Sequence, residues 1–522
     1  MKAGQRALGG LVVISCALVF GAATASGSAP IPDGAPQPGP AFTGAPATPH
    51  PIRGTPRIPH NRFMAANGVS EIHNDGWQSD VYEWDGPLGR SPQTFSTYVG
   101  GDCGSITFDR RGRVISICIS PAGPKVYMFD PHTLATLATF ALPPRTAEDR
   151  VLNPNIFQDF SSGGYFYLDN HDQVVTGTTN RHIYVIGESR SSPGFTLAHD
   201  YDLSSVLTPE EEITSQLPDS RGLLWFTARR DGVVGTLNLA TGRVHVIRLG
   251  HGTEIEITKS MATDTHGGVY IPTNRRLYRF VAGRPGGGRA RGVAGGAPRI
   301  SWQVKYSNNG VAKPGQLDAG TGTTPVISGG YVGINDNADP MDVVIYRTAV
   351  HLTREVRLHG HRHRIKLPRT VCRVPVFHRG SSADENAMIA AGRSYVIENN
   401  YVYQMPASVS GGKVTAAGFA RVDIDRSGRG CHLAWVNLTV SAPSVVSKLS
   451  LASGLIYTYT TDWSPSNPWY WTAIDFRTGA TVFRQLAGTG VYYNNNYAGI
   501  SISPTGTAYL GVLGGIVAIR DR

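Results

Sequence analysis

The chain has 522 residues, of which 48 are basic and 38 acidic, giving a formal net charge of +10. With 62 glycines, 34 prolines and only 16% charged residues, it has the wrong composition for a coiled coil or a helical bundle. Its 41% hydrophobic content is too high for a disordered chain.

Residues 1–25 have the pattern of a secretory signal peptide, so we expect a secreted or extracytoplasmic protein. Lys2 and Arg6 precede an apolar run over residues 8–23, and Ala23-Thr24-Ala25 is a cleavage site of small residues. The run is shorter than the roughly 20 residues of a spanning helix, so no membrane span is expected after cleavage. A retained anchor helix is one alternative. Lipidation at Cys16, which follows Val13-Ile14-Ser15 as in a bacterial lipobox, is another.

Residues 26–65 are expected to form a proline-rich linker. Ten prolines fall within residues 26–60. Such a stretch stays extended, like polyproline II, and buries little surface. The sequence therefore predicts a stalk that buries nothing, followed by a folded domain over residues 66–522.

Eight short turns recur at a mean spacing near 56 residues, each between two apolar runs. They are Asp109–Gly112, Asp169–Asp172, Asp219–Gly222, Asp264–Gly268, Ser328–Gly330, Ala391–Gly392, Ser453–Gly454 and Pro504–Gly506. A third and a fourth strand follow each pair, as in Thr472–Phe483. Four antiparallel strands repeated eight times indicate an all-β fold, an eight-bladed β-propeller, with seven blades as the alternative.

The eighth repeat ends at Arg522 after only three strands. The missing outer strand is expected to come from the N-terminal part, from Asp80–Trp84 or from Gln93–Val99. Closing the ring in this way removes a free sheet edge that would otherwise invite aggregation.

Five cysteines become four once the signal peptide is removed, and an even count in a secreted chain favours disulfides. Cys103 and Cys118 flank the hairpin around Asp109–Gly112, so we expect them to pair, and Cys372 to pair with Cys431 by elimination. Four buried free thiols are the alternative. The spacing does not match a structural zinc site.

The last two repeats resemble the pyrroloquinoline-quinone repeat of quinoprotein-like propellers. Ile474–Gly479 is similar to the A-x-D-x-x-T-G turn of that repeat, and Ser501–Gly511 to its S-x-D-G-x-x-Y-x-G strand pair. Trp302 and Trp435 stand in the fourth strand, where the repeat often has Trp. The resemblance implies eight blades. Gly222–Thr227 is also similar to the repeat of streptogramin-lyase-like propellers, which have seven blades.

The resemblance does not carry over to redox function. Quinoprotein dehydrogenases have two adjacent cysteines beside the cofactor, and this sequence has no Cys-Cys pair. Because a fold does not imply a function, pyrroloquinoline quinone is not expected as a cofactor.

A functional site is expected on the face where second strands end and first strands begin, because loops on a rigid scaffold often carry sites. The second strands end in runs of Asn, Asp and Arg. The residues that lead into first strands include Glu212, Lys259, Lys448 and Asn494–Asn496. Asn and Asp also form turns by bonding to their own backbone, so the choice between a shared polar site and simple turns is open.

Two kinds of ligand suit such a face. Hard cations such as Ca²⁺ take carboxylate and amide oxygens, and the residues expected to converge on one channel mouth for this purpose are Asp336, Asp339, Glu385, Asn386, Glu398 and Asn400. An arginine such as Arg275 reaching among these carboxylates is the alternative to a cation. An anionic or sugar-like ligand suits arginine forks with flanking amides and a carboxylate, and the residues expected for it are Asn180, Arg181, Arg229, Asn274, Arg275 and Asp462.

The segment Ile72–Asp80 is polar apart from one Trp and lies just before the first blade. We expect it either to lie over one end of the channel and lend His73 or Asp75 as a general base, or to satisfy only its own hydrogen bonds. The sequence contains no G-x-S-x-G and no H-E-x-x-H motif, so it names no catalytic residue.

Residues 351–373 hold +6 of the formal charge of +10. His359, His361 and His363 alternate with Arg362 and Arg364, which places imidazoles and guanidinium groups on opposite sides of a strand. The alternatives are a solvated hairpin, a metal site made by the three histidines, and attraction to an anionic cell-envelope polymer.

Three functions compete. The first is a secreted, monomeric protein that binds an anionic cell-envelope polymer or a small extracellular ligand at the channel mouth, and it ranks first because no catalytic motif is present. The second is a Ca²⁺-dependent hydrolase or lyase, and the third a quinone-dependent dehydrogenase. Nucleic acid is not expected as a partner of a secreted chain.

Overall fold

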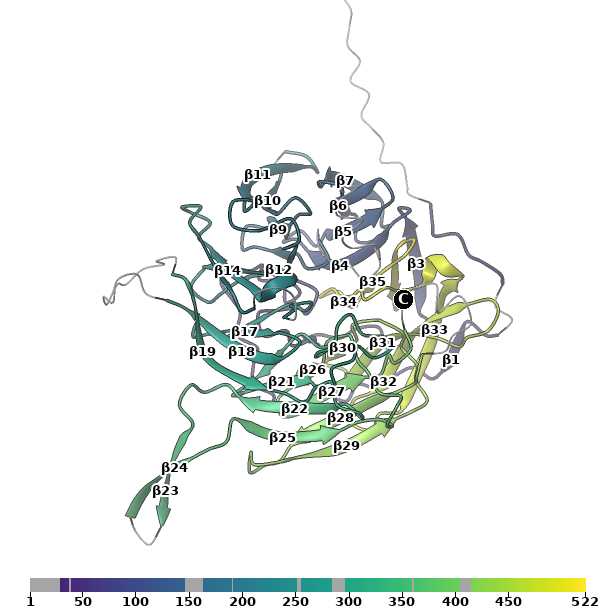
Figure 1. Ribbon diagram of the computed structural model, residues 1–522. Coiled ribbons are helices and arrows are strands. Elements are labelled where there is room, and N and C mark those ends of the chain that lie inside the picture. The colour runs from purple at the N-terminus through teal and green to yellow at the C-terminus, as the bar shows by residue number, and fades with distance from the viewer. Residues whose placement is uncertain are drawn as a thin grey trace, which may run out of the picture.

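The computed structural model describes residues 29–36, 39–145, 163–189, 191–250, 255–283, 296–358, 361–403 and 415–522. The expected signal peptide, Cys16 and His359 lie outside these ranges. Eight blades, each built on a four-stranded antiparallel sheet, form a ring (Figure 1). The eight-bladed propeller is therefore confirmed, and the seven-bladed alternative is wrong.

Blades are numbered here in chain order, and the strands of each follow one another in sequence. Blades one and two comprise β4 (Asp102–Phe108), β5 (Val114–Ser120), β6 (Gly123–Phe129) and β7 (Thr136–Ala141), then β8 (Tyr167–Leu168), β9 (Val174–Gly177), β10 (His182–Glu188) and β11 (Phe195–Asp202). Blades three and four comprise β12 (Ile213–Pro218), β13 (Leu224–Ala228), β14 (Val233–Leu237) and β15 (Val244–Arg248), then β16 (Ala262–Thr263), β17 (Val269–Pro272), β18 (Arg276–Ala282) and β19 (Pro298–Lys305).

Blades five and six comprise β20 (Val326–Ser328), β21 (Tyr331–Asn335), β22 (Asp342–Arg347) and β25 (Thr370–Pro375), then β26 (Ile389–Ala391), β27 (Ser394–Glu398), β28 (Phe419–Ile424) and β29 (Cys431–Asn437). A separate hairpin, β23 (Thr353–Leu358) and β24 (His361–Lys366), is inserted in blade five. Blades seven and eight comprise β30 (Lys448–Ser450), β31 (Leu455–Thr461), β32 (Pro468–Asp475) and β33 (Thr481–Thr489), then β34 (Ser501–Ile502), β35 (Ala508–Val512) and β36 (Gly515–Arg520). Short 3₁₀ turns, η2 (Arg230–Gly232) and η4 (Val491–Tyr493), follow β13 and β33.

Aspartate side chains build the turn between the first and second strands of blades one to four. In blade one, Oδ1 of Asp109 accepts hydrogen bonds from the amides of Arg111 at 2.9 Å and Arg113 at 2.8 Å. The corresponding aspartates of the next three blades bind the amides two and four residues onward in the same way. Such bonds favour a tight turn. This is why the repeat is visible in the sequence.

The N-terminal part closes the ring. β3 (Gln93–Tyr98) pairs with β36 and becomes the fourth strand of blade eight, as one of the two expected segments predicted. The other segment contributes β2 (Val81–Tyr82), which pairs in parallel with β30 of blade seven. β1 (Phe42–Gly44) pairs with β33 at the other edge of the same blade.

Residues 29–65 do not form the expected stalk in the parts that the structure describes. In addition to the pairing of β1 with β33, three side chains of this stretch are buried. Ile31 is only 2% exposed, Ala47 5% and Met64 1%. The prolines do leave most of this stretch outside regular strands. It nevertheless packs against the propeller, because an extended chain can pair with sheet edges and fill grooves between blades. The interpretation as a segment that buries nothing is therefore wrong.

Residues 70–82, here called the plug, lie across one end of the channel. The carbonyls of Ser70, Gly76, Trp77, Ser79 and Asp80 accept hydrogen bonds from the first strands of blades two, four, five, six and seven, respectively, or from the residues that start them. The Tyr82 hydroxyl donates to the carbonyl of Ile500, beside the first strand of blade eight, at 3.2 Å. First strands surround the channel of a propeller, so a segment bonded to five of them, and through Tyr82 to the residue before a sixth, lies inside the ring at the channel. This confirms the expected position of Ile72–Asp80.

The space between blades is filled by aromatic and branched side chains. Trp225 of β13 is fully buried, and its ring lies 6.3 Å from that of Phe280 in β18 of the next blade. Trp302 and Trp435 lie in β19 and β29, the fourth strands in which the resemblance placed them. Among the described residues, no helix is long and apolar enough to cross a membrane.

Both expected disulfides are present. Cys103 and Cys118 are register partners in β4 and β5 of blade one. Cys372 of β25 is bonded to Cys431 of β29, which joins the outer strands of blades five and six. The second disulfide therefore fastens two neighbouring blades at the rim of the ring.

Removal of this rim disulfide should destabilise the propeller. Its cysteines are 59 residues apart in sequence. Loops of this size predict a loss of about 2–5 kcal/mol when the crosslink is removed. We expect the Cys372→Ala/Cys431→Ala variant to lose this much free energy of unfolding in urea titrations. An unchanged urea midpoint would contradict the claim that this disulfide stabilises the propeller by joining blades five and six.

Candidate functional site

A cavity of about 100 Å³ lies beside the plug and is lined by residues from seven blades. Ile72 and His73 of the plug form part of its wall. Most of the other lining residues lead into first strands. The polar lining residues are His73, Asp102, Tyr165, Lys259, Glu385, Asn386, Asn496 and Tyr497, and the apolar ones include Ile72, Ile117, Ile119, Leu317, Ala387 and Val446. The polar side chains are thus gathered around one central space.

His73 is held in place by the plug itself. Its side chain is 3% exposed, its Nδ1 lies 3.4 Å from the Asp80 carboxylate, and its amide donates to Oε1 of Glu71 at 2.8 Å. Burial lowers the pKa of His73, so the imidazole is neutral at pH 7. A proton on Nδ1 that faces Asp80 leaves Nε2 as an acceptor. Nε2 has no partner among the residues that the structure describes.

Lys448 attaches the plug to blade seven. Its ammonium group donates to the Asp80 carboxylate, to the carbonyl of Ile72 and, at 2.9 Å, to Oδ1 of Asn74. The side chains of Lys448 and Asp80 are both fully buried. Buried charges are tolerated when they are paired and further hydrogen-bonded. The pair therefore fixes the plug, and with it His73, relative to the blades.

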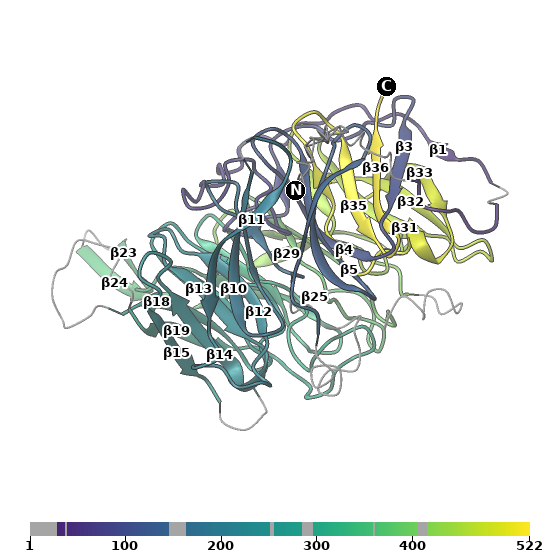
Figure 2. The same ribbon diagram turned by 90° about the horizontal axis from the view of Figure 1, so that it is seen from above.

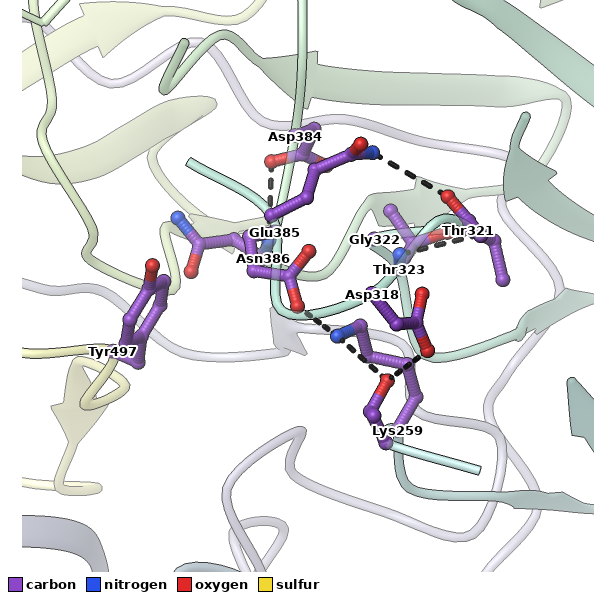
Figure 3. Close-up of polar contacts among 12 residues, drawn as sticks. Lys259, Asp318, Thr321, Gly322, Thr323, Asp384, Glu385, Asn386 and Tyr497 are labelled. Atoms are coloured by element: carbon purple, nitrogen blue, oxygen red, sulfur yellow. Dashed lines mark hydrogen bonds and ion pairs between the residues drawn. The ribbon is translucent and has the colours of Figure 1, made fainter. Parts of the chain in front are cut away.

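Lys259 and Glu385 form a second buried ion pair, between residues that lead into blades four and six (Figure 3). Their side chains are 4% and 1% exposed. Lys259 also donates to the Thr258 hydroxyl at 3.2 Å, and this hydroxyl donates to Asp318 at 2.9 Å. Burial raises the pKa of Glu385 to about 7, against the opposing effect of Lys259. Oε2 of Glu385 finds no partner within the described chain.

Asn386 is oriented by two further carboxyl groups. Its amide nitrogen donates to Glu398, whose other oxygen accepts from the Ser447 hydroxyl at 2.9 Å. Burial raises the pKa of Glu398 to about 8. Burial and the neighbouring Glu398 also raise the pKa of Asp384, which accepts the backbone amide of Asn386 at 3.1 Å. Oδ1 of Asn386 has no partner in the part of the chain described here.

Asp102, the first residue of β4, brings another carboxyl group to the cavity. Oδ2 accepts a hydrogen bond from Asn496 at 3.1 Å, whereas Oδ1 has no partner among described residues. Burial raises the pKa of Asp102 to about 6. Unlike Glu385, it forms no ion pair with any described cation.

Four buried atoms without a described partner therefore belong to residues that line one cavity: His73 Nε2, Asp102 Oδ1, Glu385 Oε2 and Asn386 Oδ1. Nearly all buried polar atoms in proteins are hydrogen-bonded, and an unpaired one costs about 1–3 kcal/mol. With both carboxyl groups ionised, all four atoms are acceptors. The cavity is therefore suited to a molecule that supplies hydrogen-bond donors.

The residues expected to bind Ca²⁺ divide into two groups. Glu385, Asn386 and Glu398 come together, and Asn400 bonds through its backbone amide to Ala383, beside them. Glu385 and Asn386 line the cavity.

Asp336 and Asp339 belong to a separate part of blade five. Asp336 lies 3.5 Å from Arg373 of the fourth strand, and Asp339 accepts the amide of Gly380 at 2.7 Å. The positive charge beside Glu385 comes from Lys259 and not from Arg275, which is exposed. Within the described ranges, no group of three or more His, Cys, Asp or Glu side chains is arranged to hold a metal ion. Ca²⁺ binding remains a prediction.

The residues expected to bind an anionic or sugar-like ligand do not line the cavity. Arg229 lies 3.5 Å from Glu256, whose amide donates to Oδ1 of Asn274, so blades three and four do bring these two residues together. Their neighbour Arg275 is exposed.

The other members of this set are dispersed around the ring. Arg181 of blade two donates to the carbonyl of Leu207, and Asn180 accepts from Thr178. Asp462 of blade seven accepts from the Tyr470 hydroxyl at 3.2 Å. The set therefore does not form one site around the cavity.

Sequence reasoning missed Asp102, Tyr165, Asp318, Asp384 and Tyr497. All five lie at or before the start of a first strand, as Lys259, Lys448 and Asn496 do. A comparison of the residues that precede the first strand in all eight blades would have identified them. Of the expected residues at the ends of second strands, Glu398 bonds to a residue that lines the cavity.

Comparison with known proteins supports the fold. No known family model matches the chain. An uncharacterized protein of Archaeoglobus fulgidus is 24% identical over 383 residues, which cover 69% of this chain and 70% of that protein. A europium-containing methanol dehydrogenase has a similar structure, with a TM-score of 0.52 and 10% identity over 87% of this chain and 97% of that one. A streptogramin B lyase matches with a TM-score of 0.39 and 11% identity over 82% of this chain and 97% of the other. The resemblance to quinoprotein-like propellers is thus confirmed as a resemblance of fold.

The cavity does not fit a fused-ring quinone. All four described cysteines are in disulfides. The volume of about 100 Å³ is also below the roughly 300 Å³ at which sites for drug-sized ligands begin.

Replacement of Lys448 should release the plug. The Lys448→Met substitution leaves the Asp80 carboxylate buried without its cation, and loss of one member of such a pair costs about 3–5 kcal/mol. Urea titrations should show this loss. The double variant Lys448→Met/Asp80→Asn should recover part of it, whereas the exposed Lys305→Met should lie within about 0.5 kcal/mol of the wild type. Equal stability of Lys448→Met and Lys305→Met would show that the plug does not depend on the pair.

Stability should decrease as the pH rises from about 5 to 8. The pKa of Glu398 is about 8 in the folded protein, against about 4.3 for an unfolded glutamate. Between these values the folded state binds more protons than the unfolded state, so increasing pH disfavours folding.

Glu398→Gln stays neutral and should therefore raise the thermal midpoint relative to the wild type at pH 8, with little difference at pH 5. The exposed Glu83→Gln is the matched control and should show no such trend. A Glu398→Gln difference that is the same at both pH values would contradict the raised pKa.

Proposed function

We propose that the protein is an extracytoplasmic binding protein whose central cavity holds a small molecule rich in hydrogen-bond donors, an amine or a polyol. One observation carries the proposal. Four buried acceptor atoms, on His73, Asp102, Glu385 and Asn386, lack partners within the described chain, and all four residues line the same cavity. A bound donor group would remove the cost of leaving them unpaired.

The charge and the size of the cavity narrow the class of ligand. Asp102 and Glu385 contribute two carboxyl groups and Lys259 one cation, which is already paired. A carboxylate or phosphate ligand would add negative charge beside buried carboxyl groups, and repulsion would oppose its binding. The volume of about 100 Å³ admits a few heavy atoms, and Ile117, Ile119 and Val446 suit a short carbon skeleton.

The extracytoplasmic location is supported by the two disulfides, because such bonds persist in oxidising compartments. It is also supported by the secretory pattern of residues 1–25.

A second candidate function is acid–base catalysis on the same ligand. Asp80 faces Nδ1 of His73, and the neutral imidazole leaves Nε2 as an acceptor with no described partner. This is how a general base is oriented by a carboxylate. If the ligand is converted, the His73→Gln variant should lose turnover while retaining most of the binding.

Ligand binding can be tested by filling the cavity. Gly104 lines it, and a Cβ atom at this position would meet no atom within 4 Å. Gly330, outside the cavity lining, is equally open and provides the matched control. Thermal shift and calorimetry with small amines, polyols, carboxylic acids and CaCl₂ would identify the class. We expect amines or polyols to stabilise the wild type and Gly330→Val but not Gly104→Val, because binding to the folded state raises stability by mass action.

Two results would contradict the proposal. One is stabilisation only by carboxylic acids. The other is equal stabilisation of Gly104→Val and Gly330→Val by the same amine or polyol, which would place binding elsewhere. Stabilisation by CaCl₂ that Glu385→Gln abolishes would support the metal site predicted from the sequence and replace the present proposal.

A further inference from the structure

The hairpin β23–β24, here called the arm, stands apart from the propeller. It joins the third strand of blade five to the fourth and forms a two-stranded sheet of its own. It projects from the rim of the ring in both views (Figures 1 and 2). We propose that the arm binds a linear polyanion, a polymer that carries repeated phosphate or carboxylate groups.

The register of the arm concentrates positive charge. Lys366 pairs with Thr353, Arg364 with Glu355, and Arg362 with Arg357. Side chains two residues apart point to the same face of a strand, so Arg362, Arg364 and Lys366 share one face. Arg362 is 73% exposed and Arg364 71%. Glu355 is the only carboxylate in the two strands, 3.5 Å from Arg362 and 3.9 Å from Arg364.

This charge distribution does not serve the stability of the arm. A two-stranded hairpin alone is marginally stable in water. Arg362 and Arg364 carry like charges on one face, and Glu355 is the only carboxylate near them in the two strands. A bound polyanion would supply the missing negative charge. Arginine forks also match phosphate and carboxylate geometry.

The base of the arm is braced, which fixes its direction. Arg369 follows β24 and donates to the carbonyls of Arg347 at 2.6 Å and Ala349 at 2.5 Å. Its guanidinium group also lies over the ring of Trp302, 4.3 Å from the centroid. Three residues further on, Cys372 is bonded to Cys431 of blade six. Because its base is already fixed, the arm loses less entropy on binding than a hairpin on a loose loop would.

The side chains of β24 favour a polymer over a lipid bilayer. Positions two apart on a strand are roughly 6.8 Å from each other, so the three cations form a row that regularly spaced anions can follow. The exposed side chains of β24 are all polar or charged, and Ile365 is only partly exposed. Insertion of a surface segment into a membrane depends on exposed apolar side chains in addition to basic ones.

The test uses the whole secreted protein and two probes, inorganic polyphosphate and polygalacturonate. The arm variant is Arg362→Gln/Arg364→Gln/Lys366→Gln. The control variant, Arg426→Gln/Arg429→Gln/Arg477→Gln, removes the same charge from exposed arginines in other turns. Affinity is measured by calorimetry over a series of NaCl concentrations. Anionic phosphatidylglycerol vesicles serve as a third probe.

We expect the arm variant to bind at least one of the two polymers at least about tenfold more weakly than the wild type, with the control close to the wild type. The slope of log K against log [NaCl] should decrease by about two, since three contacts to a flexible polyanion release that many counterions. The thermal midpoint should be unchanged, which shows that the propeller is intact. Equal losses in the two variants would mean that only net charge matters and would overturn the proposal. Binding to vesicles without binding to either polymer would also overturn it.

Discussion

The buried pair of Lys448 and Asp80 is the interaction on which the centre of this propeller depends. The first strands of a propeller surround a channel, and here the chain itself fills one end of it. A polar segment in such a place needs its charges compensated. Lys448, at the start of β30, provides this and also bonds to Ile72 and Asn74. The plug thus forms one wall of the central cavity, and His73 of the plug lines that cavity.

The closure of the ring and the formation of the site come from the same stretch of sequence. β3 completes blade eight, β2 at the end of the plug adds to blade seven, and the rest of the plug bonds to the first strands of other blades. The pairing of β3 with β36 removes a free sheet edge. The same stretch also brings a titratable side chain to the central cavity. The proposed binding site and the completion of the fold are therefore linked, and ligand bound there would stabilise the whole ring.

Much of the fold is legible in the sequence because it rests on local chemistry. In the turns of blades one to four, the aspartate carboxylate accepts hydrogen bonds from nearby backbone amides. The repeated aspartate therefore makes these four blades recognisable in the sequence. The pairing of Cys103 with Cys118 follows from hairpin geometry, and the missing strand follows from an incomplete last blade. The packing of residues 29–65 could not be read in this way, because an extended proline-rich chain has the same local pattern whether or not a surface receives it.

The site was harder to predict because it is made by residues that are distant in sequence. Asn386 and Glu398 were expected together and do meet, since one precedes and the other ends neighbouring strands of blade six. Asp102, in contrast, reaches Asn496 across 394 residues, and only the closed ring makes them neighbours. The repeat of the strands predicts on which face of the ring a side chain lies. Whether that side chain reaches the central cavity depends on the plug and on loops that have no repeated sequence pattern.

The most direct test of this account is a high-resolution crystal structure of the protein with the amine or polyol that stabilises it most. The account predicts density in the cavity beside the plug, with donor groups about 3 Å from Nε2 of His73 and from the open oxygens of Asp102, Glu385 and Asn386. A cavity closed by rearranged side chains, with these four atoms paired inside the protein and the ligand bound elsewhere, would contradict it.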